Sequence, residues 1–112
     1  MKAYIQLFTT TEKEEDAKKI AREVVRKRLA ACVQIIGPIW STYWWKEGIE
    51  ESQEWLCVMK SRDELYEKLE ETIRTIHPYE VPEILALPVV KGSPDYLRWL
   101  DKETRERTVG AG

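Results

Sequence analysis

The chain has 112 residues, of which 43% are apolar and 34% are charged, and its formal net charge is −2. This length and composition predict one globular domain and exclude a disordered chain. The net negative charge argues against binding to nucleic acid or to an anionic membrane surface. No apolar run reaches the roughly 20 residues that cross a bilayer.

The N-terminal part of the chain is predicted to form a strand followed by a helix. Residues 2–9 are rich in β-forming side chains and alternate in part between apolar and polar ones, which is typical of a strand. Thr11 and Glu14 have the spacing of a capping box, whose side chains satisfy free backbone N–H groups at the start of a helix. We therefore expect a helix that runs to about residue 29. Its apolar face would consist of Ala17, Ile20, Ala21, Val24 and Val25.

A long β-hairpin is predicted next. Residues 32–45 are β-branched and aromatic, with Gly37-Pro38 as a bulge or bend. Residues 46–48 form a turn, and residues 49–60 return as a strand. A strand over 32–45 would span roughly 46 Å, whereas a domain of this size has a radius of gyration of about 13 Å. We therefore expect the hairpin to extend beyond the core.

Both faces of this hairpin carry large apolar side chains. Strand alternation places Trp40 and Trp44 on one face, and Ile39, Tyr43 and Trp45 on the other. Two apolar faces on an overhanging ribbon would make a monomer prone to aggregate, and tryptophan and tyrosine are favoured at interfaces. The sequence thus predicts an obligate homo-oligomer whose hairpins extend the sheets of neighbouring subunits. The alternative is a hairpin that bends back over its own sheet.

The second half of the chain is predicted to form a helix and a fourth strand. Ser61 and Glu64 have the spacing of a second capping box. The helix that follows ends before Pro78, because proline clashes with the preceding helical turn. Its apolar positions are Leu65, Leu69, Ile73 and Ile76. Residues 82–90 are then predicted to form the fourth strand.

A last short helix completes the predicted domain. Ser93 is its expected N-cap, and Pro94 occupies its first position. The residues expected to face inward are Tyr96, Leu97 and Leu100. The order β-α-β-β-α-β with an added C-terminal helix predicts an α+β, ferredoxin-like domain, in which helices cover one face of an antiparallel sheet. We place this domain at residues 1–106 and a flexible tail at residues 107–112.

The stretch HPYEVPE, residues 77–83, holds the single histidine of the chain. His77 is predicted at the end of the second helix, where free carbonyl groups and the helix dipole favour the charged imidazolium. Three interpretations are open: a helix-end histidine that bonds to carbonyl groups, a metal ligand together with Glu80 or another subunit, or a general acid or base. No nucleophile or base partner stands nearby in the sequence, so we do not predict an enzyme.

Four motifs together resemble the CutA family of divalent-cation tolerance proteins. They are RLAACVQI (28–35), YWWKEGIEE (43–51), HPYEVPEILALPV (77–89) and DYLRWL (95–100), and the resemblance covers about residues 3–105. It implies a homotrimer of ferredoxin-like subunits whose hairpin arms cross at the interfaces. That trimer is similar in shape to PII-type signalling proteins, which bind small ligands in clefts between subunits. The resemblance also implies a response to copper and other divalent metal ions, with no established catalysis and no organic cofactor.

The resemblance also implies a copper site near His77. In members described as copper binders, a cysteine precedes the threonine that ends the first strand, and two consecutive histidines precede the proline of the HPY motif. Phe8 and Ile76 stand at two of these three positions in this sequence, and His77 matches the third. The resemblance therefore carries over His77 alone. With Glu80 nearby and the Cys32 thiol as further ligands from this chain, the candidate ligands for copper(II) or another divalent cation are His77, Cys32 and Glu80.

Cys32 and Cys57 are both predicted to lie in apolar strands. A free cysteine in such a place usually packs as a small apolar side chain, although thiolates also suit Cu(I) and Zn(II). Around a threefold axis, one cysteine per chain becomes three thiols. Free cysteines fit a reducing compartment, and the first residues lack the apolar core of a signal peptide, so we predict a cytoplasmic protein.

A cleft between subunits is the second candidate site. Its predicted lining residues are Tyr43, Trp45, Glu54, Lys60, Tyr79 and Glu83. The alternative for these residues is interface packing and surface charge. The function predicted from the sequence is divalent metal binding by a homotrimer. The other candidate is a PII-like regulatory or scaffold trimer that binds a small ligand or a protein partner in its clefts.

Overall fold

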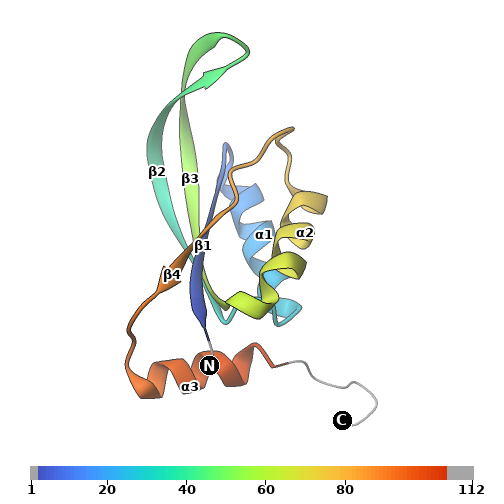
Figure 1. Cartoon of the computed structure of the whole chain (residues 1–112). Coiled ribbons are helices and arrows are strands. Elements are labelled where there is room, and N and C mark those ends of the chain that lie inside the picture. The colour runs from blue at the N-terminus through green and yellow to red at the C-terminus, as the bar shows by residue number, and fades with distance from the viewer. Residues whose placement is uncertain (1–2, 106–112) are drawn as a thin grey trace.

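The computed structural model describes residues 3–105, which form one four-stranded antiparallel sheet and three α-helices. The strand order in the sheet is β2-β3-β1-β4, and α1 and α2 lie together on one face (Figure 1). The elements are β1 (Tyr4–Thr11), α1 (Glu14–Arg26), β2 (Cys32–Trp45), β3 (Gly48–Arg62), the 3₁₀ turn η1 (Asp63–Leu65), α2 (Tyr66–Ile76), β4 (Leu85–Val89) and α3 (Pro94–Glu103). The predicted α+β class and the predicted order of elements are confirmed. Within the described part of the chain, no helix is long and apolar enough to cross a membrane.

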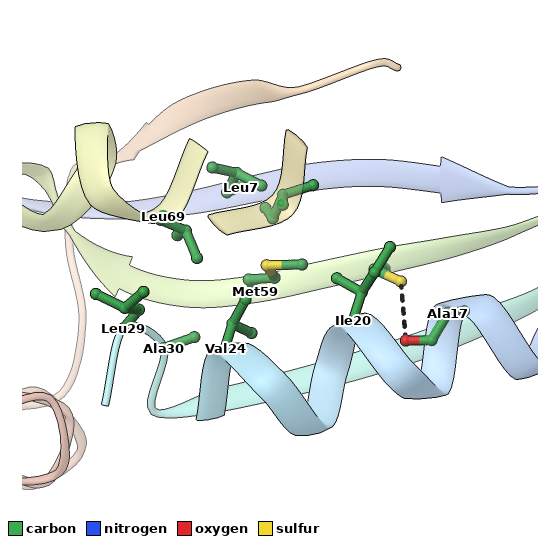
Figure 2. Packing of buried hydrophobic residues seen from close by; sticks show 10 residues of the cluster. Leu7, Ala17, Ile20, Val24, Leu29, Ala30, Met59 and Leu69 are labelled. Atoms are coloured by element: carbon green, nitrogen blue, oxygen red, sulfur yellow. Dashed lines mark hydrogen bonds between the residues drawn. The ribbon is translucent and has the colours of Figure 1, made fainter. Parts of the chain in front are cut away.

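The core lies between α1, α2 and one face of the sheet. Alternate residues of β1 point to the helices, so Leu7 is fully buried against Met59 of β3, its partner in the register. Figure 2 shows Ile20 and Val24 of α1 packing toward this layer. Of the predicted apolar face of α1, Val25 is the exception, because it lies 40% exposed on the outer side of the helix.

Both predicted capping boxes are wrong, although the two helices predicted to follow them are present. The N-cap of α1 is Lys13, and β1 continues to Thr11, whose hydroxyl donates to the carbonyl oxygen of Lys13 at 2.8 Å. Ser61 is buried and donates to the carbonyl oxygen of Leu29 at 2.6 Å. The Thr11 hydroxyl therefore bonds within its own turn, and the Ser61 hydroxyl makes a tertiary contact. The first helix also ends at Arg26, earlier than predicted.

The β2–β3 hairpin extends well past the rest of the molecule (Figure 1). The molecule measures 50 × 33 × 22 Å, and its radius of gyration is 15.1 Å, above the roughly 13 Å of a compact chain of this size. The register shifts between Ile36 and Ile39, which confirms the predicted bulge. Trp44 is 71% exposed and Ile49, its partner on β3, is 62% exposed. The predicted overhang is confirmed, and the hairpin does not fold back over its own sheet.

The last helix starts as predicted. The Ser93 hydroxyl accepts a hydrogen bond from the backbone N–H of Tyr96 at 3.4 Å, and a proline occupies the first turn. Leu100 is buried against the domain, but Tyr96 is 41% exposed, so its predicted inward position is wrong in the single chain. The predicted tail, residues 107–112, lies outside the described residues.

Candidate functional site in a groove beside the hairpin

A groove of about 740 Å³ lies between the hairpin and the connection from α2 to β4. Five of the six residues predicted for a cleft line it, as does the predicted metal ligand Glu80. These six lining residues are Tyr43, Trp45, Glu54, Tyr79, Glu80 and Glu83. HPYEVPE and the hairpin meet in this groove, and a cleft between subunits at this place stays a prediction.

Lys60 is the predicted cleft residue that the single chain does not bring to the groove. It lies six residues beyond Glu54 on β3, a distance of roughly 20 Å along a strand. Its ammonium group donates to the side-chain oxygen of Gln34 at 2.6 Å. A place for Lys60 in a cleft between chains stays a prediction.

Several lining residues were not predicted. They include Thr10, Glu12, Ser41, Thr42, Trp44 and Ser52. Strand alternation from Glu54 would have indicated Ser52, since residues two apart share a face. Thr10 lies at the end of β1 and Glu12 directly follows this strand. Both are far from the hairpin in sequence, and only the sheet order brings them near it.

Glu54 is the buried acidic residue of the groove. It is 5% exposed, and its Oε2 accepts a hydrogen bond from the Tyr79 hydroxyl at 2.5 Å. Burial raises the pKa of Tyr79, and the hydrogen bond to the Glu54 carboxylate raises this pKa further. Tyr79 thus stays protonated and serves as a donor. Within residues 3–105, no lysine, arginine or histidine forms an ion pair with Glu54.

The groove as a whole is negatively charged. Glu12, Glu80 and Glu83 line it together with Glu54, and its lining in the described chain contains no lysine, arginine or histidine. Burial raises the pKa of Glu83, and the nearby charge of Glu54 raises it as well. A cation between the Glu54 and Glu83 carboxylates would offset the effect of the Glu54 charge on Glu83.

Aromatic rings form the hairpin side of the groove. Tyr43, Trp44 and Trp45 line it. The ammonium group of Lys46 lies 5.5 Å from the centre of the Trp45 ring, which is within the range of a cation–π contact. The groove therefore combines carboxylates with aromatic faces, and both attract positive charge.

His77 lies behind the groove and holds two of its lining residues. Its Nδ1 accepts a hydrogen bond from the backbone N–H of Tyr79 at 3.1 Å, so its Nε2 carries the proton and donates to the carbonyl oxygen of Thr10 at 2.9 Å. Burial lowers the pKa of His77. The prediction that the helix end favours the charged imidazolium is therefore wrong, whereas a histidine bonded to a carbonyl group is confirmed.

The comparisons with known proteins agree with one another. Residues 5–103 match the family model described as CutA1 divalent ion tolerance protein. The chain belongs to the CutA1 family. Protein CutA of Mus musculus is 50% identical over 97 residues, and the divalent-cation tolerance protein CutA of Thermus thermophilus is 43% identical over 98 residues. These alignments cover 87% and 88% of this chain.

The fold of the family is shared as well. The solved CutA1 structure from Thermus thermophilus has a TM-score of 0.88 and 40% identity, and the alignment covers 91% of this chain and 99% of that one. CutA1 from Oryza sativa has a TM-score of 0.90 and 37% identity, with coverages of 94% and 96%. The chain spans 95% of the curated Thermus protein but 55% of the mouse protein. The family is described as one of divalent ion tolerance proteins.

The predicted CutA metal ligands lie apart in one chain. His77 bonds to Thr10, which faces Leu56 on β3, whereas half-buried Cys32 faces Lys60 further along that strand. Within residues 3–105, no group of three or more His, Cys, Asp or Glu side chains is placed to hold a metal ion. The ligand set His77, Cys32 and Glu80 stays a prediction, and it would need more than one chain.

Proposed function

We propose that this CutA protein acts in divalent-cation tolerance by binding divalent metal ions, copper(II) foremost, as a cytoplasmic homotrimer without an organic cofactor. The observation that carries the proposal is the groove, whose four carboxylates have no cationic residue beside them in the described lining. Carboxylate oxygens are ligands for hard divalent ions. The negative potential of such a groove also concentrates cations near it.

The state of His77 supports copper as the first ion to test. Imidazole suits copper, and a metal ligand must be neutral. Burial lowers the pKa of His77 and so favours the neutral ring. Binding through Nδ1 requires that the Tyr79 N–H release this atom. Tyr79 and Glu80 line the groove and belong to the connection from α2 to β4. Copper binding at Nδ1 would therefore shift this connection.

The hairpin supports the homotrimer. Trp40, Trp44 and Ile49 are each more than 60% exposed in the single chain. Covering such side chains with other copies removes apolar area from water, which favours association by about 25 cal/mol for each Å². A second chain also offers a way to complete the metal ligand set that one chain leaves dispersed.

A second candidate is a regulatory or scaffold trimer of PII type that binds a small ligand or a protein partner in its clefts. The aromatic side of the groove, with Tyr43, Trp44 and Trp45, favours it. A volume of about 740 Å³ lies within the range typical of small-molecule sites. The two candidates differ in whether a bare metal ion occupies the groove.

A titration of the purified apoprotein with copper(II), against a chelator of known affinity, tests the proposal. We expect one saturable site per chain that is weakened by His77→Ala, by Cys32→Ala and by Glu54→Gln. Glu51→Gln is the matched control, because Glu51 belongs to the same hairpin, does not line the groove, and lies three residues from Glu54 on β3, on the opposite face of the strand. Absence of competition with the chelator would contradict metal binding and leave the second candidate.

A further inference from the structure

We infer that the groove binds an organic cation, namely a linear aliphatic amine with two or more ammonium groups. This inference rests on the proposed role of the groove as a cation site. It names a ligand class that is larger than a bare metal ion and partly apolar. Four features of the groove lead to it: a buried carboxylate, an excess of negative charge, aromatic faces and its size.

The buried carboxylate is that of Glu54. Its single hydrogen bond within the described chain comes from the Tyr79 hydroxyl to Oε2, and its second oxygen accepts none. Glu54 as a whole residue is 5% exposed, and a carboxylate at such a position favours a cationic partner, because an unpaired buried charge is costly. Glu54 lines the groove, so a ligand in the groove can supply the missing positive charge. An ammonium group would also donate to the open oxygen.

The excess of charge indicates more than one ammonium group. Glu83 is close enough to Glu54 for the charge of Glu54 to raise its pKa. Glu12 and Glu80 are exposed carboxylates that line the same groove. Since no lysine or arginine lines the groove in the described chain, a ligand with one positive charge would leave most of this charge unbalanced.

The aromatic faces and the size of the groove indicate an organic ligand. Tyr43 and Trp45 offer ring surface, against which methylene groups pack and over which ammonium groups lie. The contact between the Lys46 ammonium and the Trp45 ring shows that this ring accepts such a group. A volume of about 740 Å³ exceeds the needs of one metal ion and suits a short chain molecule.

Titration of the full-length protein with spermidine, at low salt and constant ionic strength, tests this inference. Trp44 and Trp45 line the groove, so their fluorescence reports on its occupancy, and calorimetry gives the stoichiometry. We expect saturable binding of one spermidine per groove. Glu54→Gln should weaken it by about tenfold or more, the effect of losing one charge-assisted contact. Glu51→Gln removes the same charge outside the groove and should leave the affinity within about twofold.

Three results would overturn the inference. One is the absence of saturable binding, and another is equal weakening by the two substitutions, which would indicate diffuse attraction to an acidic surface. The third is spermidine binding that appears in Lys60→Ala but not in the wild type. This result would mean that the Lys60 ammonium group of a second copy occupies the groove of the wild-type protein. Light scattering on each variant checks that its mass in solution equals that of the wild-type protein. Copper(II) binding without spermidine binding would refute this inference alone, and the reverse would refute the metal proposal alone.

Discussion

Tyr79 connects the α2–β4 connection to the hairpin through one short hydrogen bond. Its hydroxyl donates to Glu54 at 2.5 Å, while its backbone N–H is held by His77. These two contacts fix the position of HPYEVPE against both β1 and β3. At the scale of single residues, the groove is therefore held by a chain of hydrogen bonds from Thr10 through His77 and Tyr79 to Glu54.

Tyr79→Phe should destabilise the protein by about 2 kcal/mol, because it leaves the buried Glu54 carboxylate without its donor. Denaturant unfolding of the variant and the wild type measures this difference. Tyr43→Phe is the control, since the Tyr43 hydroxyl lies in an exposed contact with Ser52 at 3.5 Å. Equal stabilities of the two variants would show that the Tyr79 hydroxyl contributes nothing to the groove.

Cys57 should make the fold sensitive to alkaline pH. Burial raises the pKa of its thiol from 9.0 to about 11. Between these values the unfolded chain loses the thiol proton while the folded chain retains it, so stability falls as the pH rises from about 9 to 11. The loss attributable to this group is up to about 2 kcal/mol.

Unfolding free energies measured at pH 8.5 and at pH 11, under reducing conditions, check this prediction. Cys57→Ala removes the thiol and should show a smaller loss of stability over the same interval. An equal loss in both proteins would mean that other groups account for the whole effect.

At the residue scale the sequence indicated two segments that line the groove, but not the residues with which their side chains form hydrogen bonds. HPYEVPE and the hairpin supplied most of the groove, because an isolated histidine and a dense aromatic run are visible in any sequence. The partner of His77 is the Thr10 carbonyl group, 67 residues away, and nothing local indicates it. The predicted charge state of His77 was wrong for the same reason. Burial lowers the pKa of His77 and outweighs the bond to the Thr10 carbonyl group and the charges of Asp16 and Glu54, and burial depends on the whole fold.

The bend in the hairpin depends on Gly37. A β-carbon at this position would collide with the ring of Trp55, whose side chain packs against the core. The strand can therefore pass over Trp55 only where a residue has no side chain. This packing requirement explains the glycine at the point where the β2 register shifts.

Gly37→Ala should destabilise the fold by about 1 to 3 kcal/mol, since it forces Trp55 or the strand to move. Thermal or denaturant unfolding measures the effect. Gly48→Ala is the matched control on the same hairpin, where the nearest atom to an added β-carbon lies 3.8 Å away. The account of the bend fails if the two substitutions cost the same.

At the scale of elements, periodicity predicted the helices and strands because one face of each must be buried in any fold. The ends of the elements depend on tertiary contacts and were less predictable. Thr11 and Ser61 have the spacing of helix caps, yet one hydroxyl bonds within its own turn and the other bonds to the Leu29 carbonyl group. Local spacing therefore indicated where the helices begin but not what stabilises their first turns.

At the scale of the whole molecule, the β2–β3 hairpin exposes large apolar side chains that a monomer would leave in water. Ile49→Lys changes a side chain that is 62% exposed in one chain, so it should cost the isolated chain little. In an assembly that covers the hairpin, the same change buries a charge and should shift the protein toward smaller species. Light scattering over a range of concentrations measures this shift.

Val25→Lys is the control, because Val25 is an exposed apolar residue on α1, on the helical side of the sheet. It should leave the mass unchanged. Equal effects of the two substitutions would argue against the hairpin as the interface.

The central claim is that the function resides in an assembly, since one chain leaves the hairpin uncovered and the predicted metal ligands apart. The mass of the wild-type protein in solution, measured by multi-angle light scattering, tests it most directly. The account predicts a single species near three times the 13.2 kDa mass of the chain, persisting on dilution. A stable species of one chain mass would contradict the claim and, with it, the proposed completion of the metal site by a second chain.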